Sequence, residues 1–173
     1  MKHIIWGVLF MTMGCMKPEQ TAKAVMYLAT DEAKQNPIGE VVFIDTPDGL
    51  QINIDLKNLP AGAHGFHIHE HPDCGSKTDE HGQVAHAMMA GGHYDPDHTG
   101  KHLGPDGGGH RGDLPVLYVQ KDGTAKAHML VRSLTASEIK NHSLMIHAGG
   151  DNYKDEPVPL GGGGARIACG VIR

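Results

Sequence analysis

Short apolar or alternating stretches follow one another along the chain after residue 20, and turn-forming residues separate them. This pattern is typical of an all-β sandwich or barrel, because the side chains of a strand alternate between its two faces. Pro47-Asp48-Gly49 and Lys121-Asp122-Gly123 predict hairpin turns, since glycine adopts positive φ without steric cost. Eight stretches predict strands: Ala24 to Ala29, Gly39 to Asp45, Leu50 to Leu56, Gly65 to His71, Pro115 to Gln120, Thr124 to Val131, Ser143 to His147, and Arg166 to Ile172.

One short helix is expected among these strands, over Thr135 to Asn141. Thr135 and Glu138 have the spacing of a capping box, in which the two residues satisfy free backbone N–H groups at the start of a helix. Three apolar side chains would anchor this helix on the barrel: Leu134, Ile139 and Leu144.

Two segments do not fit the strand pattern, Pro72 to Leu114 and Ala148 to Ala165, and both are rich in Gly, Pro, Asp and His. Loops of this length are uncommon in a compact domain unless they are functional, and ordering them costs about 1 to 2 kcal/mol per residue. We therefore expect two long functional loops, in which a metal site and a disulfide offset the cost of ordering.

The composition limits the classes of function. At 173 residues and 18.5 kDa the chain suits one domain. The formal net charge of -5 argues against a basic surface that wraps nucleic acid, so no nucleic acid is expected as a partner. The 24 glycines indicate many turns, and the 14 histidines indicate metal binding, because imidazole is the commonest metal ligand in proteins.

The first residues have the pattern of an export signal. Lys2 precedes an apolar run from Ile4 to Met13, which is too short to span a bilayer. We expect residues 1–20 to form a signal peptide and linker, residues 21–173 to form the folded domain, and the protein to be periplasmic or otherwise exported. Export makes disulfides permissible. Cys15 directly follows the apolar run and is the natural odd cysteine, which leaves Cys74 and Cys169 to pair.

Cys15 is also a candidate for lipidation. Thr12-Met13-Gly14-Cys15 resembles a bacterial lipobox, although Thr12 stands where leucine is usual. The alternative cleavage signal, Ala22-Lys23-Ala24, would cut into the first predicted strand and is the weaker choice. A lipid anchor to the membrane through Cys15 and a soluble exported protein are both left open.

A histidine pair begins the candidate chemistry. His67-Ile68-His69 lies in a predicted strand, so both imidazoles project from one face, roughly 7 Å apart. A single His-x-His is weak evidence, because it also occurs on solvated strand faces. Further candidate ligands follow in the long loop and in a later strand, at Gly92-His93, Lys101-His102, Gly109-His110, Gly112-Asp113 and Ile146-His147.

These residues resemble one family closely, the copper/zinc superoxide dismutases, and within it the bacterial branch. The resemblance covers nearly everything after residue 20 and implies an eight-stranded Greek-key β-barrel or sandwich, in agreement with the eight predicted strands. The motifs that carry it are Gly65-Phe66-His67-Ile68-His69-Glu70, Gly91-Gly92-His93, Gly109-His110-Arg111-Gly112-Asp113-Leu114-Pro115, Gly149-Gly150-Asp151-Asn152, and Pro159-Leu160-Gly161-Gly162-Gly163-Gly164-Ala165-Arg166 leading into Ala168-Cys169-Gly170-Val171-Ile172.

The resemblance implies two metal ions that share His93. Imidazoles suit copper in both oxidation states, and three imidazoles with a carboxylate suit a closed tetrahedral zinc site. Copper would bind His67, His69, His93 and His147, and zinc would bind His93, His102, His110 and Asp113.

The resemblance also implies roles for residues around the ions. Asp151 would orient His67 and His102, and Cys74 would form a disulfide with Cys169. Arg166 would dock the superoxide anion. His93 would release copper and take a proton when copper is reduced. The implied activity is conversion of superoxide to oxygen and hydrogen peroxide by copper redox cycling.

Several alternatives accompany this interpretation. An exported carrier of copper or zinc could use the same barrel without turnover, but loss of Arg166 or of a copper ligand would be expected in such a protein. A structural adhesion module leaves the ligand set unexplained. A monomer and a homodimer are both compatible with the sequence. Most other histidines are expected on the surface, and four of them crowd the start of the loop, where an accessory metal or haem contact is left open: His64, His71, His81 and His86.

Overall fold

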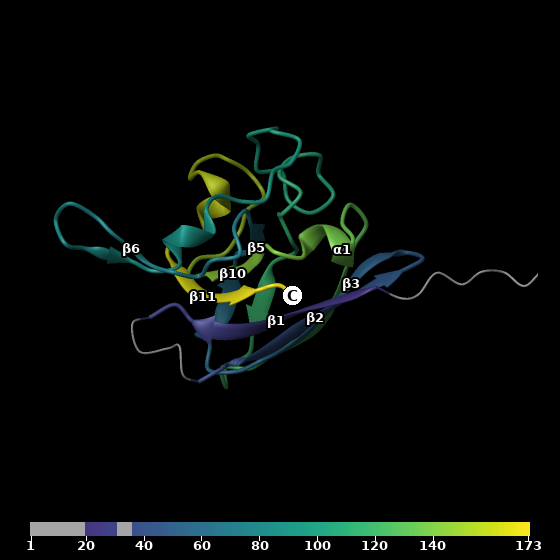
Figure 1. Cartoon of the computed structure of the whole chain (residues 1–173), viewed down its shortest axis with the longest axis horizontal. Helices are drawn as coiled ribbons and strands as arrows, with labels where there is room; N and C mark the ends of the chain where they lie inside the picture. Colours follow the sequence, from purple (N-terminus) through teal and green to yellow (C-terminus); the bar gives the residue numbers. More distant parts are fainter. Residues whose placement is uncertain (1–19, 31–35) are drawn as a thin grey trace, which may run out of the picture.

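The computed structural model describes residues 20–30 and 36–173, and their regular structure is almost entirely antiparallel β-sheet (Figure 1). Seven strands form one sheet in the order β5-β10-β11-β1-β2-β3-β9, so the last strand of the chain lies beside the first. In chain order these strands are β1 (Thr21–Leu28), β2 (Gly39–Thr46), β3 (Gly49–Leu56), β5 (Phe66–His69), β9 (Ala125–Val131), β10 (Ser143–His147) and β11 (Arg166–Val171).

A short ladder joins the two ends of this sheet. β4 (Gly62–His64) precedes β5 with only Gly65 between them, and β8 (Leu117–Val119) leads through a turn into β9. Because β4 pairs with β8, the sheet curls into a barrel. Within the described residues, β4 and β5 taken as one interrupted strand complete the predicted set of eight, and the predicted all-β fold class is confirmed.

Alternation of apolar and polar residues places the core inside the barrel. On β3, the side chains of Leu50, Ile52, Ile54 and Leu56 are buried, and the residues between them are more exposed. Phe66 and Ile68 on β5 belong to the same core. Each fully buried aliphatic or aromatic side chain contributes about 1.5 to 3 kcal/mol, so the barrel forms a stable platform for the two long loops.

Some predicted strand boundaries were wrong. β1 begins at Thr21 rather than Ala24, because its pairing with β2 extends to Thr21 opposite Ile44. The strand expected from Gly65 to His71 ends at His69. Beyond it the backbone N–H groups of Glu70 and His71 donate to carbonyls of the long loop rather than to β10.

The predicted helix is present as a single turn, α1 (Ala136–Ile139). The Thr135 hydroxyl accepts the Glu138 N–H at 3.3 Å, which is one half of the expected capping box. The other half is replaced, because the Glu138 carboxylate binds Arg111 at 2.8 Å instead. Three buried side chains anchor the turn as predicted: Leu134, Ile139 and Leu144. No helix among the described residues is long and apolar enough to cross a membrane.

The first long loop has more structure than expected. It contains a small hairpin of β6 (Lys77–Thr78) and β7 (Val84–Ala85), which protrudes from the barrel in Figure 1, and a 3-10 turn at Met88–Ala90. The second long loop contains a 3-10 turn at Leu160–Gly162. The rest of the first loop and the whole second loop rise from the same side of the barrel. This arrangement encloses the space in which the candidate ligands lie.

Candidate metal centre

Strand β5 presents two histidines to the loops. Phe66 and Ile68 point into the barrel core, so the alternation of the strand directs His67 and His69 to its other face. On that face loop segments cover both imidazoles, and His67 and His69 are 0% and 1% exposed. The strand therefore supplies two neighbouring donors in a site from which water is largely excluded.

The first long loop runs directly against β5. Ile68 donates its N–H to the Gly112 carbonyl at 2.9 Å. A Cβ on Gly112 would lie 2.3 Å from the Ile68 carbonyl oxygen, so only glycine allows this approach. Bridges of the same kind place His67 opposite Asp113 and His69 opposite His93.

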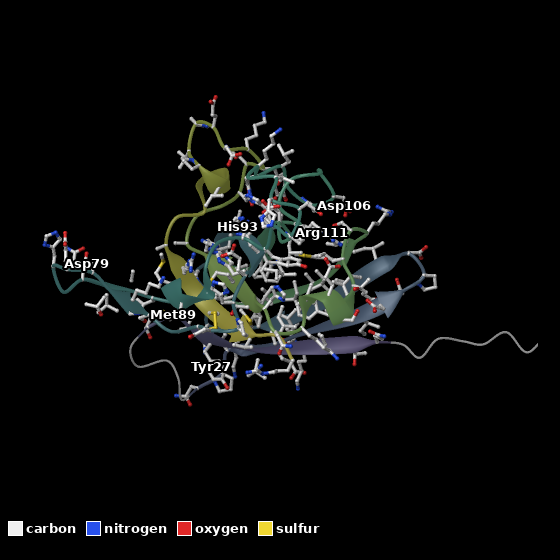
Figure 2. The ribbon with its side chains drawn as sticks, turned by 45° about the horizontal axis from the view of Figure 1, so that its top comes forward. Tyr27, Asp79, Met89, His93, Asp106 and Arg111 are labelled. Carbon is white, nitrogen blue, oxygen red and sulfur yellow. A yellow bond between two sulfur atoms is a disulfide. The ribbon has the colours of Figure 1, made fainter. Side chains whose placement is uncertain are left out.

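Seven donor residues proposed from the sequence gather above the barrel, where Figure 2 shows His93 beneath the loops. Six of them form two groups, and the donor atoms in each group lie within 4.8 Å of one another. All six are buried, and His67 and His93 belong to both groups. The groups are His67, His69, His93 and His147, and His67, His93, His102 and Asp113.

In the first group, two lone pairs face each other. His69 Nδ1 lies 3.0 Å from the Gly91 carbonyl oxygen and His147 Nδ1 lies 3.1 Å from that of Gly164. A carbonyl only accepts, so each Nδ1 carries the proton of a neutral ring and each Nε2 has a free lone pair. The two Nε2 atoms are 3.3 Å apart. Such lone pairs repel each other unless a cation lies between them, so these donors fit a metal ion.

In the second group, hydrogen bonds to Asp151 orient two of the imidazole rings. The carboxylate oxygens of Asp151 accept from His67 Nε2 and His102 Nε2, both at 2.7 Å, which leaves the Nδ1 atoms of both rings available for another partner. His102 Nδ1 lies 2.9 Å from Asp113 Oδ2. Four buried atoms make no well-aligned hydrogen bond among the described residues, although two of them form the 2.9 Å contact just given: His67 Nδ1, His102 Nδ1, His110 Nδ1 and Asp113 Oδ2. Imidazole nitrogens with one carboxylate oxygen are the ligands that zinc prefers.

His110 is the seventh donor, and it lies at the edge of the second group. Its Nδ1 is 3.5 Å from Asp113 Oδ1, and its side chain is 9% exposed. The geometric group contains His67 in its place. Sequence reasoning alone did not anticipate this closeness of His67 to both groups.

The pKa of His102 shifts in the opposite direction to those of His93 and His147. Burial lowers the pKa of His147 to about 3 and that of His93 to about 4, and neighbouring imidazoles lower both further. Burial also acts against the charged form of His102, but the adjacent carboxylates of Asp113 and Asp151 outweigh it and raise the pKa of His102 to about 9. His93 and His147 are thus neutral near pH 7, whereas His102 holds a proton beside two carboxylates.

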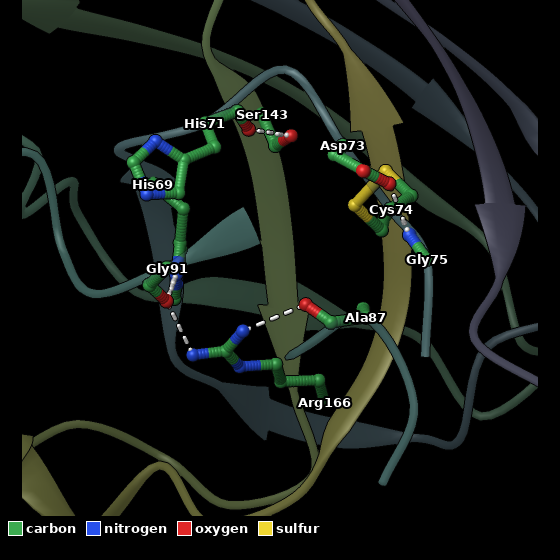
Figure 3. The surroundings of a disulfide bond; sticks show 10 residues. His69, His71, Asp73, Cys74, Gly75, Ala87, Gly91, Ser143 and Arg166 are labelled. Carbon is green, nitrogen blue, oxygen red and sulfur yellow. Dashed lines mark hydrogen bonds between the residues drawn. A yellow bond between two sulfur atoms is a disulfide. The ribbon is translucent and has the colours of Figure 1, made fainter. Parts of the chain in front are cut away.

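Arg166 begins β11, opposite His147, at a bulge in the pairing with β10. Its Nη1 donates to the Ala87 carbonyl at 2.7 Å and its Nη2 to the Gly91 carbonyl at 2.6 Å, as Figure 3 shows. Burial is the main reason why the pKa values of His69 and His147 are lowered. Neighbouring imidazoles and the positive charge of Arg166 lower them further. The guanidinium is half-buried, and its charge favours the neutral form of His69 and His147 in the first donor group.

Cys74 and Cys169 form a disulfide beside this arginine (Figure 3). The bond ties the first long loop to β11 across a sequence separation of 95 residues. It therefore also restrains the segment that carries the Ala87 and Gly91 carbonyls.

His64 is only 3% exposed and is therefore an exception to the surface position expected for most of the other histidines. Its Nδ1 lies 2.7 Å from the His147 carbonyl oxygen and its Nε2 lies 2.9 Å from that of Pro60. His64 thus helps to hold the end of β10. No third group of three or more donors is found in residues 20–30 and 36–173, so His64, His71, His81 and His86 do not form a cluster of that kind there. The signal peptide and Cys15 lie outside the described residues.

Two adjacent, histidine-rich donor groups on a Greek-key β-barrel define the class as a two-ion metalloprotein. Comparison with known proteins makes the class specific. The family model for copper/zinc superoxide dismutase (SODC) matches residues 38–172. The chain therefore belongs to the copper/zinc superoxide dismutase family, whose cofactors are copper and zinc and whose activity is the dismutation of superoxide.

Individual relatives agree over most of the chain. It is 45% identical to the copper-zinc superoxide dismutase of Escherichia coli (strain K12), with 100% of both chains covered. It is 51% identical to that of Legionella pneumophila, with 83% of both chains covered. The solved structure of the Brucella abortus enzyme matches with a TM-score of 0.84 and 46% identity, over 89% of this chain and 100% of that one.

Proposed function

We propose that this chain dismutates superoxide at a centre of two ions that share His93. The observation that carries the proposal is the pair of facing Nε2 atoms of His69 and His147, 3.3 Å apart. We assign copper to His67, His69, His93 and His147, and zinc to His93, His102, His110 and Asp113.

The available nitrogens support this division. His67 has one free nitrogen, because Asp151 holds its Nε2 at 2.7 Å. One lone pair binds one ion, so His67 cannot serve both. His93 faces Asp113 through Nδ1 at 2.9 Å and keeps Nε2 for the other ion. We therefore assign His110 rather than His67 as the remaining zinc ligand, since the buried Nδ1 of His110 has no hydrogen-bond partner among the described residues.

Bound copper supplies the one-electron redox change that oxidises one superoxide to oxygen and reduces a second to peroxide. Arg166 attracts each anion and orients it beside His147, since its two carbonyl partners fix the guanidinium there. His93 takes a proton on Nε2 in the reduced state and gives it to the peroxide. Two superoxide ions and two protons thus become one oxygen and one hydrogen peroxide.

The zinc ligands have a structural role in this proposal. They keep His93 in place while its Nε2 gains and loses a proton, because Nδ1 stays directed at the zinc side. Asp151 fixes the ring orientation of one ligand on each side, His67 and His102, through hydrogen bonds of 2.7 Å.

A metal-reconstituted activity assay tests the proposal. The protein loaded with copper and zinc should dismutate superoxide, and His147→Ala should lose copper and at least 100-fold in activity while it retains zinc. The matched control is His81→Ala, whose side chain is 76% exposed near the β6–β7 hairpin. Wild-type protein that binds both ions without turnover would replace the enzyme with a metal carrier.

We also propose that the chain is exported to the periplasm and anchored there by a lipid on Cys15. The disulfide supports an oxidising compartment. The apolar run and lipobox-like segment before residue 20 support a signal peptide, with residues 21–173 as the enzyme domain. Mass spectrometry of the mature N-terminus tests this, since a lipidated Cys15 and an unmodified later start differ in mass. Sedimentation separates a monomer from a homodimer; one chain supplies every donor in either case.

A further inference from the structure

Three alternating side chains of the second long loop face the first long loop. Asp151 accepts from the His102 ring at 2.7 Å, and Asp155 accepts the His102 backbone N–H at 3.0 Å. Tyr153 lies between these two aspartates in the sequence, and the dismutation described above gives it no part. Its contacts nevertheless reach the segments that carry two of the proposed zinc ligands, His102 and Asp113.

The backbone of Tyr153 binds the carboxylate that orients two ligands. Its N–H donates to Asp151 Oδ1 at 2.7 Å, and the same oxygen accepts from His102 Nε2 at 2.7 Å. Tyr153 has φ 57, in the left-handed region that large side chains rarely adopt. A residue stays in such a conformation only where its surroundings determine it, and such residues cluster at functional sites.

The side chain of Tyr153 provides those surroundings. Its hydroxyl accepts the Val116 N–H at 2.9 Å, shortly after Asp113 in the sequence. Its ring packs on Gly104, shortly after His102, so closely that a Cβ on Gly104 would lie 2.7 Å from Tyr153 Cγ. Tyr153 therefore contacts Asp151 and the two segments that carry His102 and Asp113.

We infer that Tyr153 is a positioning residue that holds His102, Asp113 and Asp151 in ligand geometry before zinc binds. The inference rests on the proposed zinc ligands. Groups that orient metal ligands through hydrogen bonds typically change metal affinity 10- to 100-fold when they are removed. Tyr153 acts one step further out, through the loop segments on both sides of the ion.

Tyr153→Phe tests the hydroxyl alone, because the ring and the backbone N–H remain. Zinc release from the loaded protein would be followed with a chromophoric chelator, and the ligand geometry through the visible spectrum of cobalt(II) bound in place of zinc. We expect about 10-fold faster release and an altered cobalt spectrum. Tyr118→Phe is the matched control, since Tyr118 is 69% exposed, and it should behave as wild type.

A glycine pair tests the ring contact independently. Gly104 and Gly100 both have positive φ, 73° and 59°, so alanine strains the backbone at either position. Only at Gly104 would the added methyl group strike Tyr153, because nothing lies within 4 Å of a Cβ on Gly100. Gly104→Ala should release zinc about 10- to 100-fold faster than Gly100→Ala.

A purely structural role predicts a different result. Tyr153→Phe and Gly104→Ala would then lower the thermal midpoint of the metal-free protein, while zinc release and the cobalt spectrum matched those of their controls. That outcome would overturn the inference. Failure of the proposed function is separate, because wild-type protein would then fail to bind zinc or to dismutate superoxide.

Discussion

Asp151 is the residue whose replacement tests the metal centre most directly. Its side chain is fully buried, and its two oxygens accept from His67 Nε2 and His102 Nε2 at 2.7 Å each. An asparagine of the same shape offers one acceptor oxygen and one donor NH2 group. Asp151→Asn therefore leaves one histidine N–H facing another donor, which favours the wrong tautomer or rotates the ring.

The structure sets the magnitude of this effect. A hydrogen bond to a charged partner contributes about 1.5 to 3 kcal/mol, and 1.4 kcal/mol corresponds to a factor of ten. Loss of one such bond should weaken metal binding by about 10- to 150-fold. The loss falls on zinc if His102 turns, on copper if His67 turns, and on both if the two conformations interchange.

Metal competition with a chelator of known affinity measures this change, and circular dichroism checks the fold. Asp48→Asn is the control, because Asp48 is exposed in the turn between β2 and β3. If folded Asp151→Asn bound both copper and zinc within about 3-fold of wild type, orientation by Asp151 would be unnecessary and the reasoning would fail.

Three further predictions concern protons and the disulfide. Zinc binding to the metal-free protein at pH 7.5 should release about one proton, because the pKa of His102 is about 9 and a ligand must be deprotonated; equal calorimetric heats in buffers of different ionisation enthalpy would contradict this. The metal-free protein should lose stability as pH falls from about 6.5 towards 4, because the folded-state pKa values of His93 and His147 are about 4 and 3 and the unfolded chain binds protons first. Over that range His102 stays protonated and contributes constantly, so a urea midpoint that rises towards pH 4.5 would be inconsistent with these shifts. Cys74→Ser should cost about 4 to 5 kcal/mol in urea unfolding, from a loop closed across 95 residues, and reduction of the wild type should match it.

Local patterns predicted the barrel well because strand alternation is a local property. β10 spans Ser143–His147 as predicted, and β3 starts only one residue earlier than expected. The β6–β7 hairpin was not predicted, because strands of two residues are too short to show an alternation of apolar and polar side chains. Glu138 was assigned to the helix cap, but its carboxylate binds Arg111 of the distant loop. No pattern within the helix itself reports that competing partner.

The candidate site was predictable only in part from the residues themselves. The spacing of His67 and His69 fixed their shared face, but convergence of the remaining donors followed from the family resemblance rather than from any pattern in the loops. Burial of His64 between the carbonyls of Pro60 and His147 could not be foreseen, because it depends on how β4 meets the end of β10. A single histidine between Ala63 and Gly65 gives no signal of such a position.

Arg166 allows charge and geometry to be separated at the substrate site. Arg166→Lys keeps a positive charge but loses the fork that binds the Ala87 and Gly91 carbonyls at 2.7 and 2.6 Å. Arg166→Ser loses both. A charge about 6 Å from the anion is worth about 0.7 to 3 kcal/mol between bulk water and a partly buried site, so Arg166→Ser should lower kcat/KM by about 3- to 100-fold and weaken its dependence on ionic strength. Arg166→Lys should keep that dependence with a smaller loss of rate. If both variants showed the wild-type rate and salt dependence, the anion would not pass Arg166, and its contact with Gly91 would serve only to hold the loop beside His69.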